Sequence, residues 1–221
     1  MRESENELIL RIKTSTFFYR HPLTTTSPVS LIVPPPTAIM GLLAAILGKG
    51  ANDIKENRKI IKNEIQDKIE KLQIYITDDS IKKIKESAIL RFNVDETKQK
   101  DRWSTPMTTT FMLETEVWVE IYFKDRKLQE ELKSSIQNYV SKFTPYLGSS
   151  SDLIQTIEVK TREELDNNKV NLWSLEPKEI KGINEGDEIK PIGKIPWEYD
   201  DEGLWLLKEA ILRRSRLILT N

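Results

Sequence analysis

The segment from Val33 to Gly48, VPPPTAIMGLLAAILG, limits the possible folds more than any other part of the chain. Its consecutive prolines cannot lie inside a helix or a central strand, because each lacks an N–H donor and has a fixed φ. Thr37 follows them at the position of an N-cap, an apolar run comes next, and Gly48 stands where helices commonly end. The segment predicts a short buried helix whose N-terminus is exposed after a stiff, extended entry.

The start of this helix has two interpretations. Unpaired N–H groups and the partial positive charge of a helix N-terminus suit a phosphate group. An ordinary core helix with a proline entry has the same pattern. This second interpretation needs no ligand, since most helix caps bind only their own side chains. In both cases the helix is expected to be buried, so a large side chain at Gly41 or Ala44 would overpack it.

Hydrophobic periodicity predicts an α+β fold. Alternating segments predict strands over 8–12, 72–77, 87–93, 111–123 and 153–160, and helical spacing predicts helices over 54–72 and 126–143. The apolar stripe of the last helix includes Tyr139, Val140 and Phe143. The order strand, helix, two strands, helix, strand is the ferredoxin-like pattern, here with an extra charged helix. This plan is close to that of RRM domains, whose open sheet face commonly binds single-stranded RNA.

Two further segments are expected beside this core. A mostly polar stretch at about 93–110 joins two predicted strands and is typical of a β-hairpin arm inserted in a domain that spans 1–160. Its cations could neutralise phosphates and its tryptophan could stack on a base; a mobile surface loop is the alternative. These residues are Lys98, Lys100, Arg102 and Trp103. Residues 161–221 are expected to form a small β-rich extension, an extra sheet packed on that domain.

Composition excludes several classes of site. The 221 residues include no cysteine, which rules out disulfides, thiolate zinc sites and cysteine nucleophiles, and one histidine, which argues against a metal site. No phosphate-binding glycine loop is present, so no cofactor is expected. The net charge of −1 argues against strong nucleic-acid binding by the chain alone and allows RNA contact within an assembly. With a polar N-terminus and no spanning apolar run, a cytoplasmic protein without membrane contact is expected.

Three motifs in sequence order resemble the Cas-five family, the RAMP-type subunit of CRISPR Cascade complexes. They are the aromatic-arginine segment 16–22 (TFFYRHP), the proline–helix segment, and the turn 145–151 (PYLGSSS). The resemblance covers about residues 7 to 160. It implies the same ferredoxin-like plan, with the arm acting as a thumb that wedges against the guide RNA and the neighbouring backbone subunit.

The resemblance also implies a function. The chain would be a non-catalytic RNA-binding subunit of a type I surveillance complex, holding the 5′ handle of the crRNA in antiviral defence. It would cap the filament of backbone subunits and contact the large subunit, with target DNA reached only through the assembled complex and read by guide pairing. The residues expected to contact RNA, besides the arm, are Tyr19, Arg20, His21, Thr37, Gly148, Ser149 and Ser150.

Two other functions stay open. One branch of the same family processes its guide RNA with a tyrosine, a lysine and a histidine, and its Lys-His pair follows the thumb. This chain has no histidine beyond His21, so an endoribonuclease does not fit that pattern. The other alternative is an interaction-only scaffold, including a subunit of a type III effector complex. No catalytic residue and no metal ligand are assigned.

Overall fold

The computed structural model describes residues 6–21, 29–82, 84–93, 103–148, 153–179 and 187–214, and for 84–93 and 103–109 it describes the backbone. Eight strands of these residues form one sheet in the order β5-β1-β4-β2-β6-β8-β7, and β3 pairs with β4 outside this path. The strands are β1 (Glu7–Phe17), β2 (Ile69–Thr77), β3 (Ile84–Asn93), β4 (Trp103–Phe123), β5 (Ile154–Lys160), β6 (Leu172–Pro177), β7 (Glu188–Tyr199) and β8 (Trp205–Arg214). The helices are α1 (Pro36–Leu47), α2 (Ile54–Glu64), α3 (Asp78–Lys82), α4 (Arg126–Gln137) and α5 (Arg162–Asn168), with single 3-10 turns η1 (Gln66–Lys68) and η2 (Lys169–Asn171).

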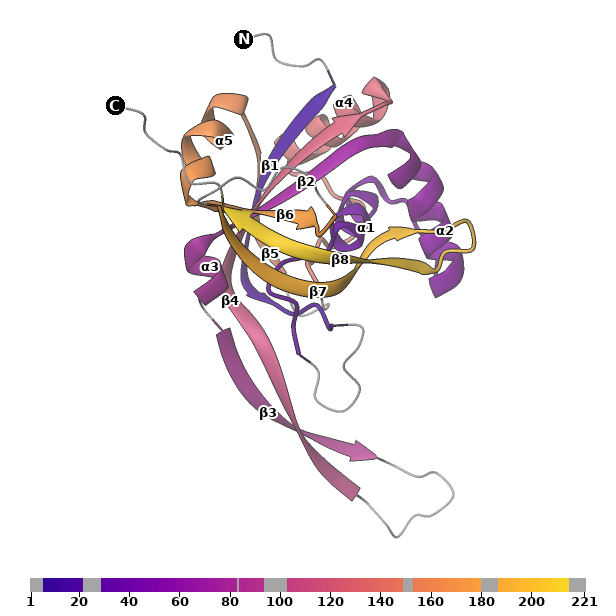
Figure 1. Ribbon diagram of the computed structural model, residues 1–221. Helices are drawn as coiled ribbons and strands as arrows, with labels where there is room; N and C mark the ends of the chain where they lie inside the picture. The colour runs from indigo at the N-terminus through magenta and orange to yellow at the C-terminus, as the bar shows by residue number, and fades with distance from the viewer. Residues whose placement is uncertain are drawn as a thin grey trace, which may run out of the picture.

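The core lies between the centre of the sheet and helices α1 and α4 (Figure 1). β1 and β4 are antiparallel, and Leu10 faces Val119 in the ladder. Because side chains alternate across a strand, every second residue of β1 and β4 points to the same side. Leu10, Ile12 and Val119 have no exposed surface. The alternating pattern therefore identified the central strands and their buried face.

Helix α4 ends earlier than its sequence pattern predicts. It begins after Asp125, whose side chain accepts hydrogen bonds from the first turn, and it ends at Gln137. Three residues expected in its apolar stripe lie beyond this end and are exposed, namely Tyr139 (92%), Val140 (50%) and Phe143 (54%). The predicted stripe is therefore wrong in its last turn. Helix α2 is likewise shorter than predicted, because the chain turns through η1 and enters β2 at Ile69.

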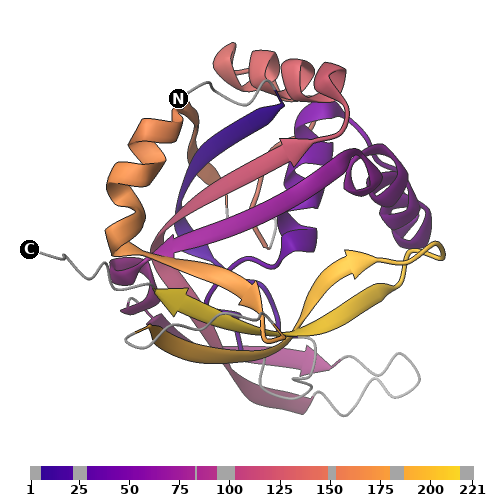
Figure 2. The ribbon, with the colours of Figure 1, turned by 45° about the horizontal axis from the view of Figure 1, so that its top comes forward.

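The C-terminal strands continue the central sheet and do not form the separate small sheet that was expected. β6 pairs with β2, with Leu175 opposite Ile74, and β8 and β7 follow in order. The β7–β8 hairpin then passes over α1 and α2 (Figure 2). The side chain of Gln66 fixes its end, because its Nε2 donates to the carbonyl of Tyr199 at 2.9 Å and its Oε1 accepts from the Tyr199 amide at 2.7 Å.

Strands β3 and β4 form a hairpin arm that extends away from the body of the molecule (Figure 1). The ladder runs from Ile84 opposite Met112 to Asn93 opposite Trp103. The observed arm therefore spans about residues 84–112 and is longer than the predicted arm at about 93–110. Trp103 lies at the outer end of the ladder. Lys98, Lys100 and Arg102 lie outside the described residues.

Helix α5 packs against part of the other face of the sheet (Figure 2). Leu165 of α5 is fully buried in a small apolar cluster with Ile9, Trp118 and Leu172. Beside it, Arg11 makes a two-pronged ion pair with Glu116, with N–O distances of 3.0 and 2.9 Å. This face therefore carries a helix and carboxylates, and it differs from the open, RNA-binding face of an RRM domain.

A buried carboxylate, Glu120, connects α5 to this face. It accepts hydrogen bonds from Tyr75 Oη at 2.7 Å, Tyr122 Oη at 2.8 Å and Arg162 Nη2 at 2.7 Å. Arg162 also pairs with Glu7 at the start of β1. Burial and the charge of Glu120 raise the pKa of the Tyr75 phenol, and burial together with the Glu120 hydrogen bond raises that of Tyr122 to about 12. Both phenols are therefore protonated donors at neutral pH.

These raised pKa values predict a loss of stability in alkali. The folded state holds the phenol protons more tightly than the unfolded chain, whose tyrosines ionise near pH 10. Their contribution is complete below about pH 10 and is lost as the pH rises toward the folded pKa. We expect Tyr75→Phe to flatten the fall of unfolding free energy between about pH 9 and 11 in urea titrations. Tyr139→Phe, at a 92% exposed position, is the matched control, and an equal slope in both variants would contradict the assignment.

Among the described residues, no helix is both long enough and apolar enough to cross a membrane.

Candidate functional site

A cavity of about 380 Å³ lies beside α1, and all three sequence motifs contribute to its wall. Tyr19 comes from the aromatic-arginine segment, Gly41 from the middle of α1, and Gly148 from the turn before β5. Two elements that the motifs did not include complete it: Asn57 from α2 and Tyr199 from β7. Segments that are far apart in the sequence therefore form one site.

Helix α1 does not begin as predicted. Its N-cap is Pro35, in extended conformation, and Pro36 occupies the first helical position, where a missing N–H costs nothing. Thr37 lies inside the first turn with 1% of its surface exposed, and its hydroxyl donates to the carbonyl of Pro196 on β7 at 3.4 Å. The expected Thr37 cap and exposed helix N-terminus are therefore wrong, because prolines take the first positions and β7 covers them. Gly48 ends the helix with φ 70°, as predicted.

Two tyrosines form a polar part of the cavity wall. Burial raises the pKa of Tyr19, and burial together with the neighbouring Tyr19 raises that of Tyr199 to about 12. Hydrogen bonding to Thr37 and the charge of Arg58 partly offset both shifts. At neutral pH these phenols keep their protons. They can donate hydrogen bonds or stack against a ring, but they are not general bases.

Gly148 joins the turn to the aromatic segment. It has φ 103°, and a Cβ atom there would lie 2.1 Å from the backbone oxygen of Phe18. Only glycine allows this approach. Ser149 and Ser150, the next predicted residues, lie outside the described part of the chain.

Gly41 faces the cavity without filling it. A Cβ atom added there would meet no atom of the described residues within 4 Å. The space beside Gly41 argues against the predicted overpacking by a large side chain at this position, whereas Ala44 is 1% exposed, as expected for a core position. A glycine in a helix interior costs about 0.5–1 kcal/mol relative to alanine. No packing contact among the described residues requires a glycine at this position.

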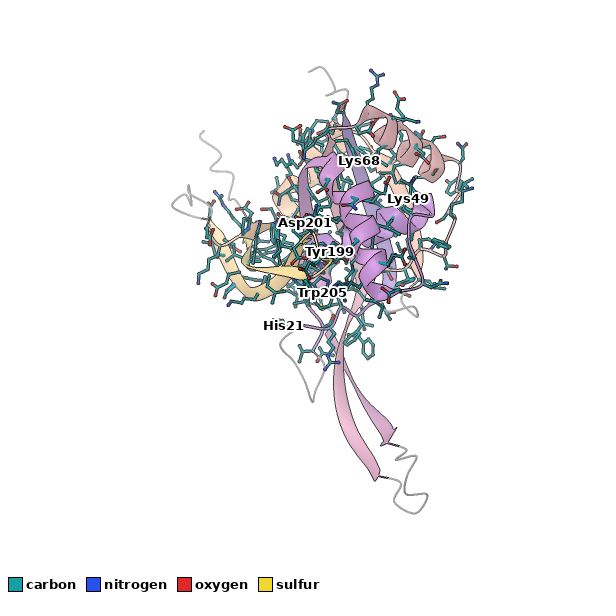
Figure 3. The ribbon with its side chains drawn as sticks, turned by 90° about the vertical axis from the view of Figure 1, so that its right-hand side faces the viewer. His21, Lys49, Lys68, Tyr199, Asp201 and Trp205 are labelled. Atoms are coloured by element: carbon teal, nitrogen blue, oxygen red, sulfur yellow. The ribbon has the colours of Figure 1, made fainter. Side chains whose placement is uncertain are left out.

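Two cations lie near the cavity. Lys49 contributes to its wall and makes a long ion pair with Glu64, at 3.9 Å. The Arg58 guanidinium lies 4.5 Å from the centre of the Trp205 ring at the end of the β7–β8 hairpin. Figure 3 shows Lys49, Tyr199 and Trp205 on the same side of the molecule. The site thus combines cations, aromatic rings and hydrogen-bond donors.

Arg20 and His21 lie outside the cavity wall. Arg20 is exposed and forms an isolated bridge with Ser30, and the His21 amide donates to Val29 at 2.8 Å. The His21 ring lies beside Gly193 on β7, toward the arm (Figure 3). The structure therefore brings Tyr19, Thr37 and Gly148 together and leaves these two residues on a neighbouring surface.

Sequence reasoning missed several residues at or beside the cavity, among them Lys49, Asn57, Arg58, Phe143 and Tyr199. Lys49 and Asn57 had no local signal beyond their proximity to the apolar helix. Tyr199 reaches the cavity through the long-range pairing of β7, which no local pattern predicts. Within the described residues, no group of three or more His, Cys, Asp or Glu side chains could hold a metal ion.

Comparison with known proteins shows which family this chain matches. A family described as CRISPR-associated protein (Cas_Cas5) matches residues 7–168, most of the chain. The chain belongs to the Cas5 family. The match includes all three motifs and ends before β6, so Tyr199 lies on the part of this Cas5-family chain beyond it. A search of curated proteins found no match.

Two solved structures have a similar fold. One is described as "CRISPR RNA-guided surveillance complex", with 11% identity, a TM-score of 0.52, and coverage of 94% of this chain and 87% of the other. The second is described as "Crystal structure of Cas protein", with 14% identity, a TM-score of 0.53, and coverage of 94% and 95%. At these identities the likeness concerns the fold of the Cas5-family chain and not its ligands.

Proposed function

We propose that this Cas5-family chain is a non-catalytic RNA-binding subunit of a type I CRISPR Cascade complex, and that the cavity beside α1 holds part of the 5′ handle of the crRNA. One observation carries the proposal: three distant motifs converge on a cavity that also has two cations nearby. Lys49 and Arg58 suit phosphates, and Tyr19 and Tyr199 suit an unstacked base or its polar edge. Gly41 leaves room for the RNA.

Membership of the Cas5 family supports a proposal for the wider assembly. The order β5-β1-β4-β2 with α1 and α4 on one face agrees with a ferredoxin-like, RAMP-type domain. The β3–β4 arm would then be the thumb that contacts the neighbouring backbone subunit. The chain would also meet the large subunit of the complex in the cytoplasm and reach target DNA only through the assembly.

A guide-processing ribonuclease is less well supported by the geometry. The sole histidine, His21, does not contribute to the cavity wall, and the phenols of Tyr19 and Tyr199 hold their protons. A base that removes a proton from a ribose hydroxyl needs a suitable pKa and hydrogen-bond reach. We therefore assign binding and not cleavage to the cavity.

Two substitutions at Gly41 test the stability of the helix and the binding of RNA separately. Gly41→Ala is expected to raise the unfolding free energy by about 0.5–1 kcal/mol, because alanine is the better helix former. Gly41→Phe is expected to weaken RNA retention about tenfold or more, because its ring occupies the cavity and displaces a stacked base. Filter binding of labelled guide RNA to the purified complex and thermal unfolding of the chain measure the two effects.

The control places a phenylalanine elsewhere: Val170→Phe, half-exposed near α5 on the other face of the sheet, should leave RNA retention unchanged. Equal RNA retention in wild type and Gly41→Phe would overturn the cavity assignment. Incubation of the chain with repeat RNA tests the enzyme alternative. Cleavage that is lost in His21→Ala would replace the binding assignment.

A further inference from the structure

Tyr139 occupies a backbone position that favours glycine. It has φ 55°, and two hydrogen bonds close the end of α4 around it: Val140 N to Ser135 O at 2.9 Å and Tyr139 N to Ile136 O at 3.1 Å. This is the Schellman arrangement, whose left-handed residue is usually glycine because a Cβ is unfavourable there. Tyr139 is 92% exposed, so packing against the described residues does not compensate for this strain.

The exposed residues around Tyr139 are held firmly. We call Tyr139, Val140 and Phe143 the aromatic corner. The amides of Lys142 and Phe143 donate to the carbonyls of Ile46 and Ala45, both at 3.1 Å, which ties the corner to the last turn of α1. The corner is therefore a fixed part of the surface and not a loose loop.

The stem of Lys142 adds to this fixation. A Cβ atom on Gly48 would lie 2.8 Å from the Lys142 Cβ, so the lysine stem packs directly against the end of α1. The Lys142 stem therefore lies over Gly48 at the end of α1, while the residue as a whole stays exposed.

The chemistry of the corner favours one kind of occupant. Residues 138–148, NYVSKFTPYLG, include three aromatic side chains and a lysine but no carboxylate. Phe143 and Tyr146 also contribute to the cavity wall, so the corner continues the cavity outward. Exposed rings beside a cation, without nearby acids in the segment, suit single-stranded nucleic acid, whose bases can stack on the rings while a phosphate meets the cation.

We infer that the aromatic corner is a stacking platform for unpaired RNA bases next to those held in the cavity. Tyr139 and Phe143 present ring faces to the bases, and Lys142 meets the intervening phosphate. The inference rests on the proposed function, since it extends the RNA path from the cavity to the end of α4. It explains why a strained tyrosine stands where glycine would be more stable.

Tyr139→Gly separates the platform from folding. The variant is expected to raise the melting temperature by about 2–4 °C, because it relieves the left-handed strain. It is expected to weaken RNA retention by the purified ribonucleoprotein complex about tenfold, because one stacking ring is lost. Tyr139→Phe keeps the ring and should bind RNA as the wild type does. A photoreactive benzoyl-phenylalanine at position 139 should crosslink to the guide RNA in the same complex.

Other results would overturn the inference. A crosslink from position 139 to a protein subunit alone would make the corner a protein interface. Unchanged RNA retention in Tyr139→Gly, or the absence of any crosslink, would exclude the platform. If Gly41→Phe loses RNA while Tyr139→Gly retains it, only the platform fails. If both retain RNA, the proposed function fails as well.

Discussion

Replacing Arg162 by alanine is expected to lower the free energy of unfolding by about 3–5 kcal/mol. Arg162 pairs with Glu7 and Glu120, whose side chains are 7% and 5% exposed. Without the guanidinium, two buried carboxylates lose their counter-charge at neutral pH. The phenols of Tyr75 and Tyr122 still donate to Glu120, but a neutral donor does not replace the positive charge.

Urea unfolding at pH 7 measures this loss. Arg126→Ala removes an exposed ion pair with Glu130, with side chains 60% and 59% exposed, and should change stability little. Adding Glu120→Gln to Arg162→Ala should recover part of the loss, because one of the unpaired charges is then absent. Equal stability of Arg162→Ala and Arg126→Ala would show that the pair is not buried in solution.

Gly148→Ala is expected to cost at least about 3 kcal/mol and to abolish RNA retention. The new methyl group would lie 2.1 Å from the Phe18 carbonyl oxygen, and φ 103° is itself unfavourable for alanine. Backbone atoms cannot rotate away as a flexible side chain can. The turn must therefore move from the aromatic segment, which opens the wall of the cavity between them.

Gly193→Ala is the matched control for this substitution. Gly193 has φ 90°, but its added Cβ would lie 3.8 Å from the nearest atom, His21 Nε2, an ordinary contact. This variant should show the cost of the backbone conformation alone, about 1–2 kcal/mol. Thermal unfolding of both variants isolates the steric part, and equal losses would argue against the close approach at Gly148.

The central sheet and α1 were predictable because their signals are local. Alternation in β1 and at the core end of β4 identified buried positions such as Ile12 and Val119, and the apolar run ending at Gly48 identified α1. The order of strands and helices followed from the order of these patterns along the chain. The family resemblance grouped the three motifs, and residues of all three line the cavity.

The start of α1, the end of α4 and the position of Tyr199 could not be predicted in this way. They depend on competition between local signals or on pairing between distant strands. Thr37 is a good N-cap by residue type, but Pro36 fits the first helical position better and displaces the cap to Pro35. Tyr139 and Phe143 continue the apolar spacing of α4, so periodicity could not reveal that the helix ends before them. Tyr199 reaches the cavity only because β6 pairs with β2 and carries β7 back over α1.

The continuity of β4 has a mechanical consequence. Residues 103–112 of this strand form the arm, residues 112–122 pair with β1, and residues 117–123 also pair with β2 at the centre of the sheet. A pull along the arm therefore loads two ladders in shear, so that many backbone hydrogen bonds share the force at once. An arm attached to an edge strand would peel open one hydrogen bond at a time. This chain can thus transmit tension from the end of its arm to its core without first losing its fold.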